Sequence, residues 1–566
     1  MALLPIQIPP GFHQNQTQYQ AKNTWFKGNL VRFSEGRLRP IGGWTRLADT
    51  QLANPVRGLH SWRSVSGERY LAVGTTKTLH LWDSTTAGDT NSPLYNVTPL
   101  DAQTGGTNVF ENQSDFGVRG LGFGALDYSE EYYGTPREPI QADIFAPTWS
   151  IDNYGDDMLA CHTNQGDIWY WDKSGNTFTN SSQTGTRMVK LSSLGGSSGC
   201  PSGCNGVLVT PERHVLALSP SGDVRQVMWS SQESLTAWTP TASNTAGDLS
   251  LQTKGMIVGA RKTRYGTLVF TTSDVWRLNY LGAPYIYGAE RLTEGVGPVG
   301  ANCIAGSADF LAWLSPGRFW SYSGGYIKEL DCSCADAIFS DINLDIEGLI
   351  YAGHNPLYGE IWWLYPLEGE ETPTQYVIYS YRENHWTTGQ LERSAWSDSG
   401  ALGYPVAAGS DGYLYKHELG FDPNAKTLKR DTSAVVPTDI PGLSGLESRV
   451  LSQGVDSVAY PNVGSEDHMC YAETGAIEIG SGTEMMSVNQ ILTDTDAGAN
   501  GLRLSIRVAD APDETVTEKG PYALSSDGFT DTRFTGRQAF LRVESPYDQE
   551  WRFGTVRFSA NTAGRR

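Results

Sequence analysis

Short apolar runs separated by polar turns recur along the first three quarters of the chain. Leu71–Thr75 is followed by Leu79–Asp83, and Leu159–Thr163 is followed by Ile168–Asp172. Each pair consists of an apolar run, a polar turn and an aromatic run that ends in Trp-Asp. Runs of this length, rich in Val, Leu, Ile and aromatic residues, are typical of β-strands. The pattern therefore predicts a series of β-hairpins.

Related hairpins follow the first two at a nearly regular interval. With one apolar residue of each hairpin as its marker, successive markers lie 88, 57, 52, 43, 50 and 46 residues apart. A four-stranded blade of a β-propeller occupies roughly 40 to 50 residues, so the spacing predicts a propeller of six or seven blades. The long first interval predicts an insertion at about residues 84–150, which are rich in Gly, Tyr and Asn. The markers are Leu71, Leu159, Leu216, Leu268, Leu311, Ile361 and Ala407.

A propeller has to close, because an open ring exposes two strand edges that can pair with other chains. Leu30–Arg46 contains two short strand-like runs around a Ser-Glu-Gly turn. We expect this stretch to supply the missing strands of the last blade, so that residues 30–420 form the propeller. The preceding residues 1–29 include the Gln- and Asn-rich stretch Gln14–Gln20 and are expected to form an extended arm.

The hairpin pattern stops after residue 420. Residues 421–466 are rich in Pro, Asp, Ser and Gly, which predicts a linker or an inserted loop. From residue 467 onward strand-like runs return, and in residues 502–508 apolar side chains alternate with Arg and Ser. Alternation with a period of two predicts a sheet with one buried face. Residues 467–566 are therefore expected to form a smaller C-terminal β-sandwich-like domain.

Charge is unevenly distributed along the chain. The net charge is −20, yet residues 501–566 hold 10 Lys and Arg against 9 Asp and Glu, which leaves 32 against 53 in the first 500 residues. The large acidic part is expected to repel nucleic acid. The arginines of the C-terminal domain are candidates for a surface that docks an acidic neighbour, and a simply solvated sheet face is the alternative interpretation. These arginines are Arg503, Arg507, Arg533, Arg537, Arg542, Arg552 and Arg557.

The composition favours an all-β protein without a membrane anchor. Aromatic residues make up 11% of the chain and charged residues 18%, with 63 Gly and 28 Pro, which suits short strands and tight turns. No run approaches the roughly 18 consecutive apolar residues of a membrane span, so no stable membrane insertion is expected. Met1–Pro10 lacks the basic residues and the cleavage site of a signal peptide. Synthesis in a cytoplasm is therefore expected.

Residue patterns that would indicate catalysis are weak. Gly195–Gly199 matches Gly-x-Ser-x-Gly, but it lies in a run of Ser and Gly rather than between a strand and a helix. No two carboxylates are marked as the acid and base of a glycosidase. Most Trp residues recur at equivalent hairpin positions, where packing between blades explains them. We therefore expect neither enzyme activity nor a cofactor.

Candidate metal ligands are weak as well. Two pairs of cysteines could form a four-thiolate site if the fold joined them, but their spacings are unusual for zinc, and free thiols are expected. Four polar residues at alternate positions are expected to be the wet face of a strand rather than a calcium loop. The cysteines are Cys200, Cys204, Cys332 and Cys334; the alternating residues are Asp341, Asn343, Asp345 and Glu347; and a second weak calcium candidate is Asp494–Asp496.

A series of short strings extends over most of the chain. They are Val31–Phe33 through Gly42–Trp44, Asn96–Pro99, Tyr133–Arg137, Thr148–Gly155, Val209–His214, Trp229–Gln232 to Trp238–Pro240, Asn244–Leu249, and Gly536–Gln538 to Ala563–Arg566. In this order they resemble a family of virion proteins of tailed bacteriophages, related to the tail nozzle or DNA-stabilising tail proteins of short-tailed phages. Each string is short, so the resemblance rests on their order, and residues 421–466 stand apart as an insertion.

The resemblance implies a structural protein of the virion tail that is made in the cytoplasm of a bacterial host. It implies a ring, typically of six copies, that continues the DNA channel below the portal and its adaptor and retains packaged DNA until ejection. The implied partners are further copies of the chain, the adaptor or portal-proximal tail protein, tail fibres or other tail proteins, and double-stranded DNA that passes without sequence-specific binding. The family supplies no catalytic residues. An acidic wall is compatible with this role, because it offers DNA phosphates no binding station.

Two other functions remain open from the sequence. A receptor- or carbohydrate-binding tail module would use surface Trp residues and the insertion loops, because flat aromatic rings stack on sugars. A propeller that depolymerises a cell-surface glycan is the third possibility, and it would need a pair of facing carboxylates.

Overall fold

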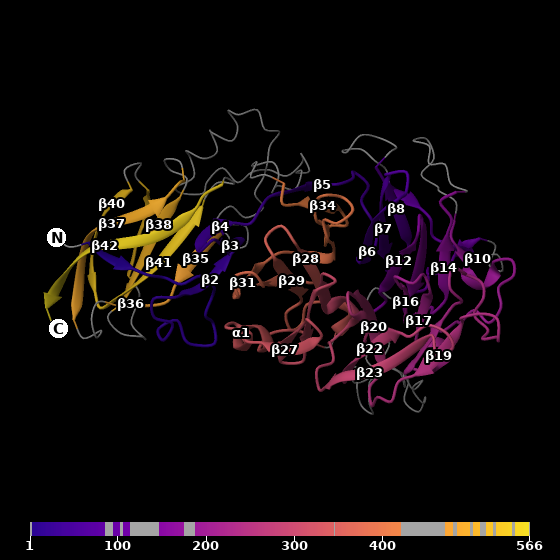
Figure 1. The fold of residues 1–566 in the computed structure, drawn as a ribbon. Coiled ribbons are helices and arrows are strands. Elements are labelled where there is room, and N and C mark those ends of the chain that lie inside the picture. Colours follow the sequence, from indigo (N-terminus) through magenta and orange to yellow (C-terminus); the bar gives the residue numbers. More distant parts are fainter. Residues whose placement is uncertain are drawn as a thin grey trace, which may run out of the picture.

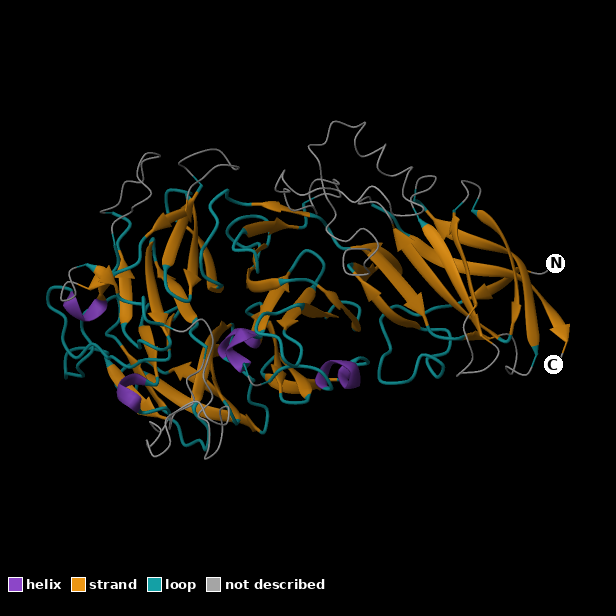
Figure 2. Ribbon diagram, turned by 180° about the vertical axis from the view of Figure 1, so that it is seen from behind, coloured by secondary structure: helices purple, strands orange, loops and turns teal. Residues whose placement is uncertain are grey.

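A computed structural model of the protein has two parts, a disc of radially arranged sheets and a two-sheet sandwich beside it (Figure 1). Nearly all of the regular structure is β (Figure 2). The expected fold class, an all-β protein with a propeller of six or seven blades and a smaller β-sandwich-like domain, is confirmed. The predicted linker, residues 421–466, lies outside the described residues. The structure describes residues 3–84, 94–101, 106–113, 146–174, 187–344, 346–419, 470–478, 484–497, 502–509, 517–524, 528–545 and 550–564.

Seven four-stranded antiparallel sheets form the blades within the described residues. Blades 1 and 2 are β6 (Val56–Arg63), β7 (Arg69–Thr75), β8 (Leu79–Asp83), β9 (Leu94–Asn96) and β12 (Trp149–Tyr154), β13 (Asp157–His162), β14 (Ile168–Trp171), β15 (Val189–Lys190). Blades 3 and 4 are β16 (Gly206–Val209), β17 (Val215–Leu218), β18 (Gln226–Trp229), β19 (Gly247–Ser250) and β20 (Ile257–Thr263), β21 (Gly266–Thr271), β22 (Asp274–Tyr280), β23 (Tyr287–Glu294).

The remaining three blades complete the disc. Blades 5 and 6 are β24 (Ile304–Gly306), β25 (Phe310–Ser315), β26 (Arg318–Ser323), β27 (Tyr326–Leu330) and β28 (Tyr351–Asn355), β29 (Glu360–Tyr365), β30 (Gln375–Ser380), β31 (His385–Gln390). Blade 7 is β32 (Arg393–Ser397), β33 (Val406–Gly409), β34 (Leu414–His417) and β5 (Trp44–Arg46). Outside the blades lie the hairpin β10 (Leu100–Asp101) and β11 (Thr107–Asn108), helix α1 (Ala335–Phe339), and the 3-10 turns η1 (Leu191–Ser193), η2 (Pro220–Gly222), η3 (Ala301–Cys303) and η4 (Glu347–Leu349). Among the described residues no helix has the length and apolar character that crossing a membrane requires.

The seven marker residues of the hairpin pattern each lie in the second strand of one blade, from Leu71 in β7 to Ala407 in β33. All seven are buried, because the second strand of a blade is covered on both faces by neighbouring blades. One interval of the pattern therefore corresponds to one blade. The predicted insertion at residues 84–150 is corrected in part, because β9 lies inside it and is the fourth strand of blade 1.

Blade 7 closes the ring with a strand from the N-terminal part of the chain. β5 pairs with β34 through Trp44 opposite His417 and Thr45 opposite Lys416, and β32 packs against β6 of blade 1. The expectation that Leu30–Arg46 completes the last blade holds for β5 alone. The two strands before it, β3 (Val31–Ser34) and β4 (Arg37–Pro40), belong to the sandwich.

The sandwich consists of two sheets and takes strands from both ends of the chain. The prediction that residues 1–29 form an extended arm is wrong for two segments, β1 and β2. Both pair with strands of the C-terminal part of the chain and cover sheet edges that this part would otherwise expose. One sheet contains β1 (Leu3–Ile6), β3, β4, β37 (Met485–Thr495), β40 (Phe529–Gly536) and β42 (Phe553–Gly564). The other contains β2 (Trp25–Asn29), β35 (Cys470–Thr474), β36 (Ile477–Glu478), β38 (Arg503–Ala509), β39 (Thr517–Ala523) and β41 (Gln538–Ser545).

A hydrophobic cluster continues from the sandwich into the propeller. The ring of Phe33 in β3 lies 5.8 Å from that of Phe12 and 5.5 Å from that of His385 in blade 6, with edge-to-face geometry in both pairs. Trp25 of β2 contacts Phe33 on one side and Phe553 of β42 on the other. The junction between the two parts is therefore built like a protein core, and it holds the sandwich against the rim of the propeller.

A buried charge cluster crosses the same junction. Arg32 of β3 pairs with Glu360 of blade 6 (Nε to Oε1, 2.9 Å) and with Glu418 (Nη1 to Oε2, 2.9 Å), and its guanidinium lies 3.7 Å from the centre of the Tyr358 ring. All three charged side chains are almost fully buried. Burial acts to lower the pKa of Arg32, but the two carboxylates outweigh it and the pKa is raised. Arg32 thus joins one strand of the sandwich to two blades.

Blades pack on one another through tryptophans that lie over glycines. Trp149 of β12 lies against Gly58 of β6 and Gly74 of β7, where a Cβ atom added to either glycine would come within 2.7 Å of the tryptophan. The indole N–H of Trp149 donates to the carbonyl of Thr75 at 2.6 Å. This agrees with the interpretation of Trp residues as packing groups between blades.

Acidification is expected to destabilise the protein through buried histidines such as His162. Burial between Trp149 and Phe110 lowers the pKa of His162 to about 4, although a hydrogen bond with the Thr76 carbonyl acts to raise it. From pH 7 to pH 5 the unfolded chain binds a proton at this residue and the folded chain does not, so about 2 kcal/mol of stability is lost. In urea unfolding at the two pH values, His162→Gln should lose about 2 kcal/mol less than the wild type. Equal losses would contradict the assignment.

Candidate functional site

The first strands of the seven blades enclose a cavity of about 470 Å³ on the propeller axis. Residues of β6, β12, β16, β20, β24, β28 and β32 line it, so the cavity is the central channel of the propeller. Pockets of roughly 300–1,000 Å³ suit small molecules. A DNA duplex cannot thread a channel of this volume.

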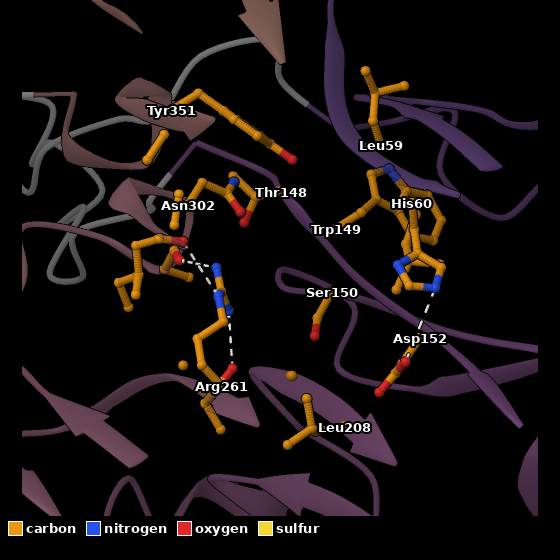
Figure 3. A pocket seen from close by; sticks show the side chains of 18 of the residues that line it. Leu59, His60, Thr148, Trp149, Ser150, Asp152, Leu208, Arg261, Asn302 and Tyr351 are labelled. Atoms are coloured by element: carbon orange, nitrogen blue, oxygen red, sulfur yellow. Dashed lines mark hydrogen bonds and ion pairs between the residues drawn. The ribbon is translucent and has the colours of Figure 1, made fainter. Parts of the chain in front are cut away.

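A polar cluster lines the channel (Figure 3). Asp152 of β12, whose side chain is 4% exposed, pairs with Lys262 of β20 at 2.7 Å and accepts the backbone N–H of Val209 in β16 at 2.8 Å. His60 of β6 lies 3.9 Å from Asp152 and 3.2 Å from the Asn153 side-chain oxygen. Burial lowers the pKa of His60 even though Asp152 acts to raise it. One carboxylate therefore connects four consecutive blades.

Arg261 makes a second set of links in the channel. Its guanidinium donates to the carbonyls of Ala301 at 2.7 Å, Ala260 at 2.9 Å and Ile304 at 3.3 Å, as the dashed lines at this residue in Figure 3 indicate. Burial lowers the pKa of Arg261. These bonds join blade 4 to blade 5 at a point where β24 is only three residues long.

The geometry of the channel is that of a structural hub. Asp152 and Arg261 are bonded to groups of neighbouring blades, and Ser397 of blade 7 donates to Ser61 of blade 1 at 2.9 Å. The hydrogen-bond partner of His60 is a carboxamide rather than the hydroxyl or thiol that nucleophilic catalysis would require. The cluster can therefore hold the blades in register, which is its clearest physical role.

Removal of the Lys262 ammonium should weaken the hub. Lys262→Met leaves buried Asp152 without its cation, and because the lysine is partly exposed the expected loss is about 1–2 kcal/mol. Thermal unfolding checks this. A suitable control is Lys254→Met, since Lys254 is highly exposed and pairs with half-exposed Glu294. Equal melting temperatures for the two variants would show that the pair contributes nothing.

The arginines predicted to form one docking surface are divided between the two sheets. Arg503 and Arg507 in β38 and Arg542 in β41 belong to one sheet, whereas Arg533 in β40 and Arg557 in β42 belong to the other. Because the sheets face each other across the core, their outer faces point in opposite directions. Arg537 lies in the turn between β40 and β41, and Arg552 directly precedes β42. The prediction that these seven arginines form one continuous surface is therefore wrong.

Several of these arginines are engaged within the sandwich. Arg507 pairs with buried Glu473, and Arg542 pairs with Glu544 at 3.1 Å. Arg552 pairs with Asp496 at 3.4 Å. Arg533 and Arg557 are exposed, and neither has an ion pair with a described residue.

The structure does not bring together the four cysteines that were candidates for a metal site. Cys200 and Cys204 lie in the core between blades 2 and 3, whereas Cys332 and Cys334 lie in the cluster that reaches the sandwich, and all are free thiols. In the part of the chain that the structure describes, no three His, Cys, Asp or Glu side chains are grouped so that they could hold a metal ion.

The two calcium candidates also have other environments. The prediction of a strand around Asp341 and Asn343 is wrong, because this stretch is a turn with one isolated bridge, followed by η4. The side-chain amide of Asn343 donates to the Glu370 carbonyl. Asp345 lies outside the described residues. In the second candidate, Asp496 accepts the backbone N–H of Arg552 at 2.6 Å and pairs with the guanidinium of the same residue at 3.4 Å, so an arginine supplies the positive charge beside this carboxylate.

Sequence reasoning did not identify the channel residues. Their common signal is position, because each polar residue stands in the second half of the first strand of a blade or directly after that strand. His60, Asp152, Lys262, His354 and Asp398 all occupy such places. The hairpin pattern does not mark these positions, because it follows the second and third strands of the blades.

Comparison with known proteins gives no family. No protein-family model matches the chain. No curated protein matches it either. Among solved structures, a catalytically inactive virginiamycin B lyase from Staphylococcus aureus with quinupristin has 10% identity and a TM-score of 0.37, over 66% of this chain and 99% of its own.

Two further solved structures are comparably distant. PorZ of the type-IX secretion system of Porphyromonas gingivalis has 8% identity and a TM-score of 0.35, over 78% of this chain and 44% of its own. Hsv2 of Kluyvelomyces marxianus has 7% identity and a TM-score of 0.27, over 46% of this chain and 72% of its own. These scores are too low to carry an argument about function. The strand pairings of the chain itself define its fold.

Proposed function

We propose that the protein is a structural component of a phage tail, the nozzle ring that extends the DNA channel below the portal and adaptor and retains packaged DNA until ejection. The observation that carries the proposal is the closed disc with a narrow hub bonded across its blades. Such a disc is a rigid building block, and DNA would pass beside it, in a lumen formed between copies. The ordered strings described above supply the likeness to tail proteins of short-tailed phages.

The charge of the chain supports the same role. A ring of six chains, each with a net charge of −20, would place a strongly acidic wall around the lumen. Such a wall repels phosphates and provides no station at which DNA would be held. The ring would be made in the bacterial cytoplasm and incorporated into the virion tail, with the adaptor and other tail proteins as neighbours.

The proposed role is not catalytic. The polar groups of the channel bond to neighbouring blades, and burial raises the pKa values of the Cys200 and Cys204 thiols to about 11 and about 12, which disfavours the reactive thiolate. The second candidate function is a receptor- or carbohydrate-binding tail module, which exposed tyrosines on the propeller would favour. A glycan depolymerase is the third.

Native mass spectrometry and electron microscopy of the purified protein test the proposal. The expected result is a closed ring, six copies in the simplest case, that does not release reducing sugar from host envelope. A protein that remains monomeric at high concentration, or one that cleaves envelope glycan, would contradict it.

A further inference from the structure

Exposed aromatic and apolar side chains gather at the turns of two neighbouring blades. Tyr265, Tyr280, Leu281 and Tyr285 lie in the turns of blade 4, and Tyr326 begins the last strand of blade 5. Tyr285 is 76% exposed and Tyr326 81%. We call these five residues the tyrosine patch. A group of exposed rings on a soluble protein indicates a binding surface.

Strand direction places the whole patch on one face of the disc. Strands alternate in direction within a blade, so the turn after the first strand and the turn after the third lie on the same face. Tyr265 follows a first strand, whereas Tyr280, Tyr285 and Tyr326 border turns that follow third strands. The outer strands β23 and β27 of the two blades are in contact. The patch therefore spans two neighbouring blades on one face of the disc.

The patch rests on a packed base. The ring of Tyr280 lies 5.6 Å from that of Tyr287, which lies 5.2 Å from Trp229 of blade 3. Leu281 folds back on Gly288, where an added Cβ would come within 2.9 Å of the leucine. Rigid aromatic groups lose little conformational freedom when they bind, which favours affinity.

Charged side chains around the patch are paired with one another. Arg264 pairs with Asp309 at 2.8 Å, which links the first turns of the two blades, and Arg277 pairs with Glu290 at 2.6 Å. These pairs are neutral, and the chain as a whole carries a net charge of −20, so a partner that presents apolar groups together with arginine complements this surface.

The outer face of one sandwich sheet has this chemistry. One row of paired residues crosses the strands β1, β42, β37 and β40, and its side chains share a face. The row consists of Pro5, Arg557, Leu492 and Phe529, in that strand order. Arg533 on β40 lies on the same face, since residues 529, 531, 533 and 535 are the exposed ones of that strand. We call it the arginine face. It is the part of the predicted docking surface whose arginines, Arg533 and Arg557, are free of ion pairs with described residues.

We propose that the tyrosine patch of one copy binds the arginine face of the next copy. The two surfaces lie apart on the molecule, with β22 and β23 at the lower middle of the view and the sandwich strands β37, β40 and β42 at its left end (Figure 1), so they cannot meet within one chain. Contacts between different surfaces of identical chains are head-to-tail, and they close into a ring when the rotation permits. Tyrosine and arginine are the residues that dominate such interfaces, and guanidinium groups bind aromatic faces.

This inference rests on the proposed function in one respect, namely that the chain assembles with itself. Two sets of variants test it in analytical ultracentrifugation. Tyr285→Ser with Tyr326→Ser removes exposed rings, and Arg533→Glu with Arg557→Glu reverses the charge of the arginine face. Each set should weaken assembly at least tenfold while the melting temperature of the subunit stays unchanged. Val65→Ser is the matched control, because Val65 is 94% exposed in a turn of the same face but belongs to blade 1.

A cross-linking experiment tests the pairing directly. Tyr285→Cys and Arg557→Cys variants are prepared separately and then mixed under mild oxidation. The proposal predicts a disulfide-linked pair that contains one chain of each variant, and little cross-linking in either variant alone. If the wild type forms rings and both sets of variants assemble as well as the wild type, this interface is wrong, but the proposed function still stands. A monomeric wild type would overturn both.

Discussion

Replacement of Arg32 by methionine is expected to destabilise the protein by about 3–5 kcal/mol. The variant leaves two buried carboxylates, Glu360 and Glu418, without a counter-charge, and it removes the guanidinium from the Tyr358 ring. Burial already raises the pKa of Glu360, so without the arginine this residue should take up a proton, and the loss should be smaller at pH 5 than at pH 8. Urea unfolding of the wild type and of Arg32→Met at both pH values tests this, and the difference between their midpoints should be smaller at pH 5.

Arg39 provides a control for this experiment in the neighbouring strand. It pairs with Glu35, whose side chain is largely exposed, so Arg39→Met should cost less than about 1 kcal/mol. Arg32→Lys should remain strongly destabilising, because one ammonium cannot replace the guanidinium that contacts both carboxylates. If Arg32→Met and Arg39→Met behave alike, the cluster does not join the two parts of the molecule.

Deletion of residues 1–43 is expected to unfold the sandwich although residues 467–566 are all retained. The deletion removes β1, β2, β3 and β4, which supply strands to both sheets, together with core side chains such as Trp25 and Phe33. β5 is kept, so the propeller can still close. Limited proteolysis followed by mass spectrometry should show rapid cleavage within the sandwich strands β35 to β42 and protection of the blade strands β6 to β9 and β12 to β34.

The opposite outcome is equally specific. If residues 467–566 formed a domain of their own, as the sequence alone predicts, the truncated protein would keep a protease-resistant fragment over that range. A matched control is a chain that lacks only residues 1–2, which lie outside every described strand and should leave the digestion pattern unchanged.

The hairpin spacing predicted the propeller because a blade is a local structure. Markers such as Leu216 and Leu268 lie in strands that pair with neighbours only a few residues away, so their order is visible in the sequence. The last strand pair, β34 with β5, joins residues more than 350 positions apart. It was anticipated only because a ring must close, and that argument does not distinguish β5 from β3 and β4.

The sandwich shows where the sequence pattern stops being informative. Alternation of apolar residues and arginines in β38 reveals a buried face, but it does not tell which sheet each strand joins, and Arg507 and Arg533 consequently lie on different sheets. The partners of β1 and β2 are likewise beyond a local pattern. The channel residues are set by position on a closed ring, so His60 and Asp152 come together only when the blades are assembled in order.

The proposed role in a phage tail is tested most directly by a map of a virion that contains this chain. We expect a ring of seven-bladed discs below the portal and adaptor, with DNA in the lumen between copies and none in the hub of any disc. Discs found only at the tips of fibres, or a virion without them, would contradict it.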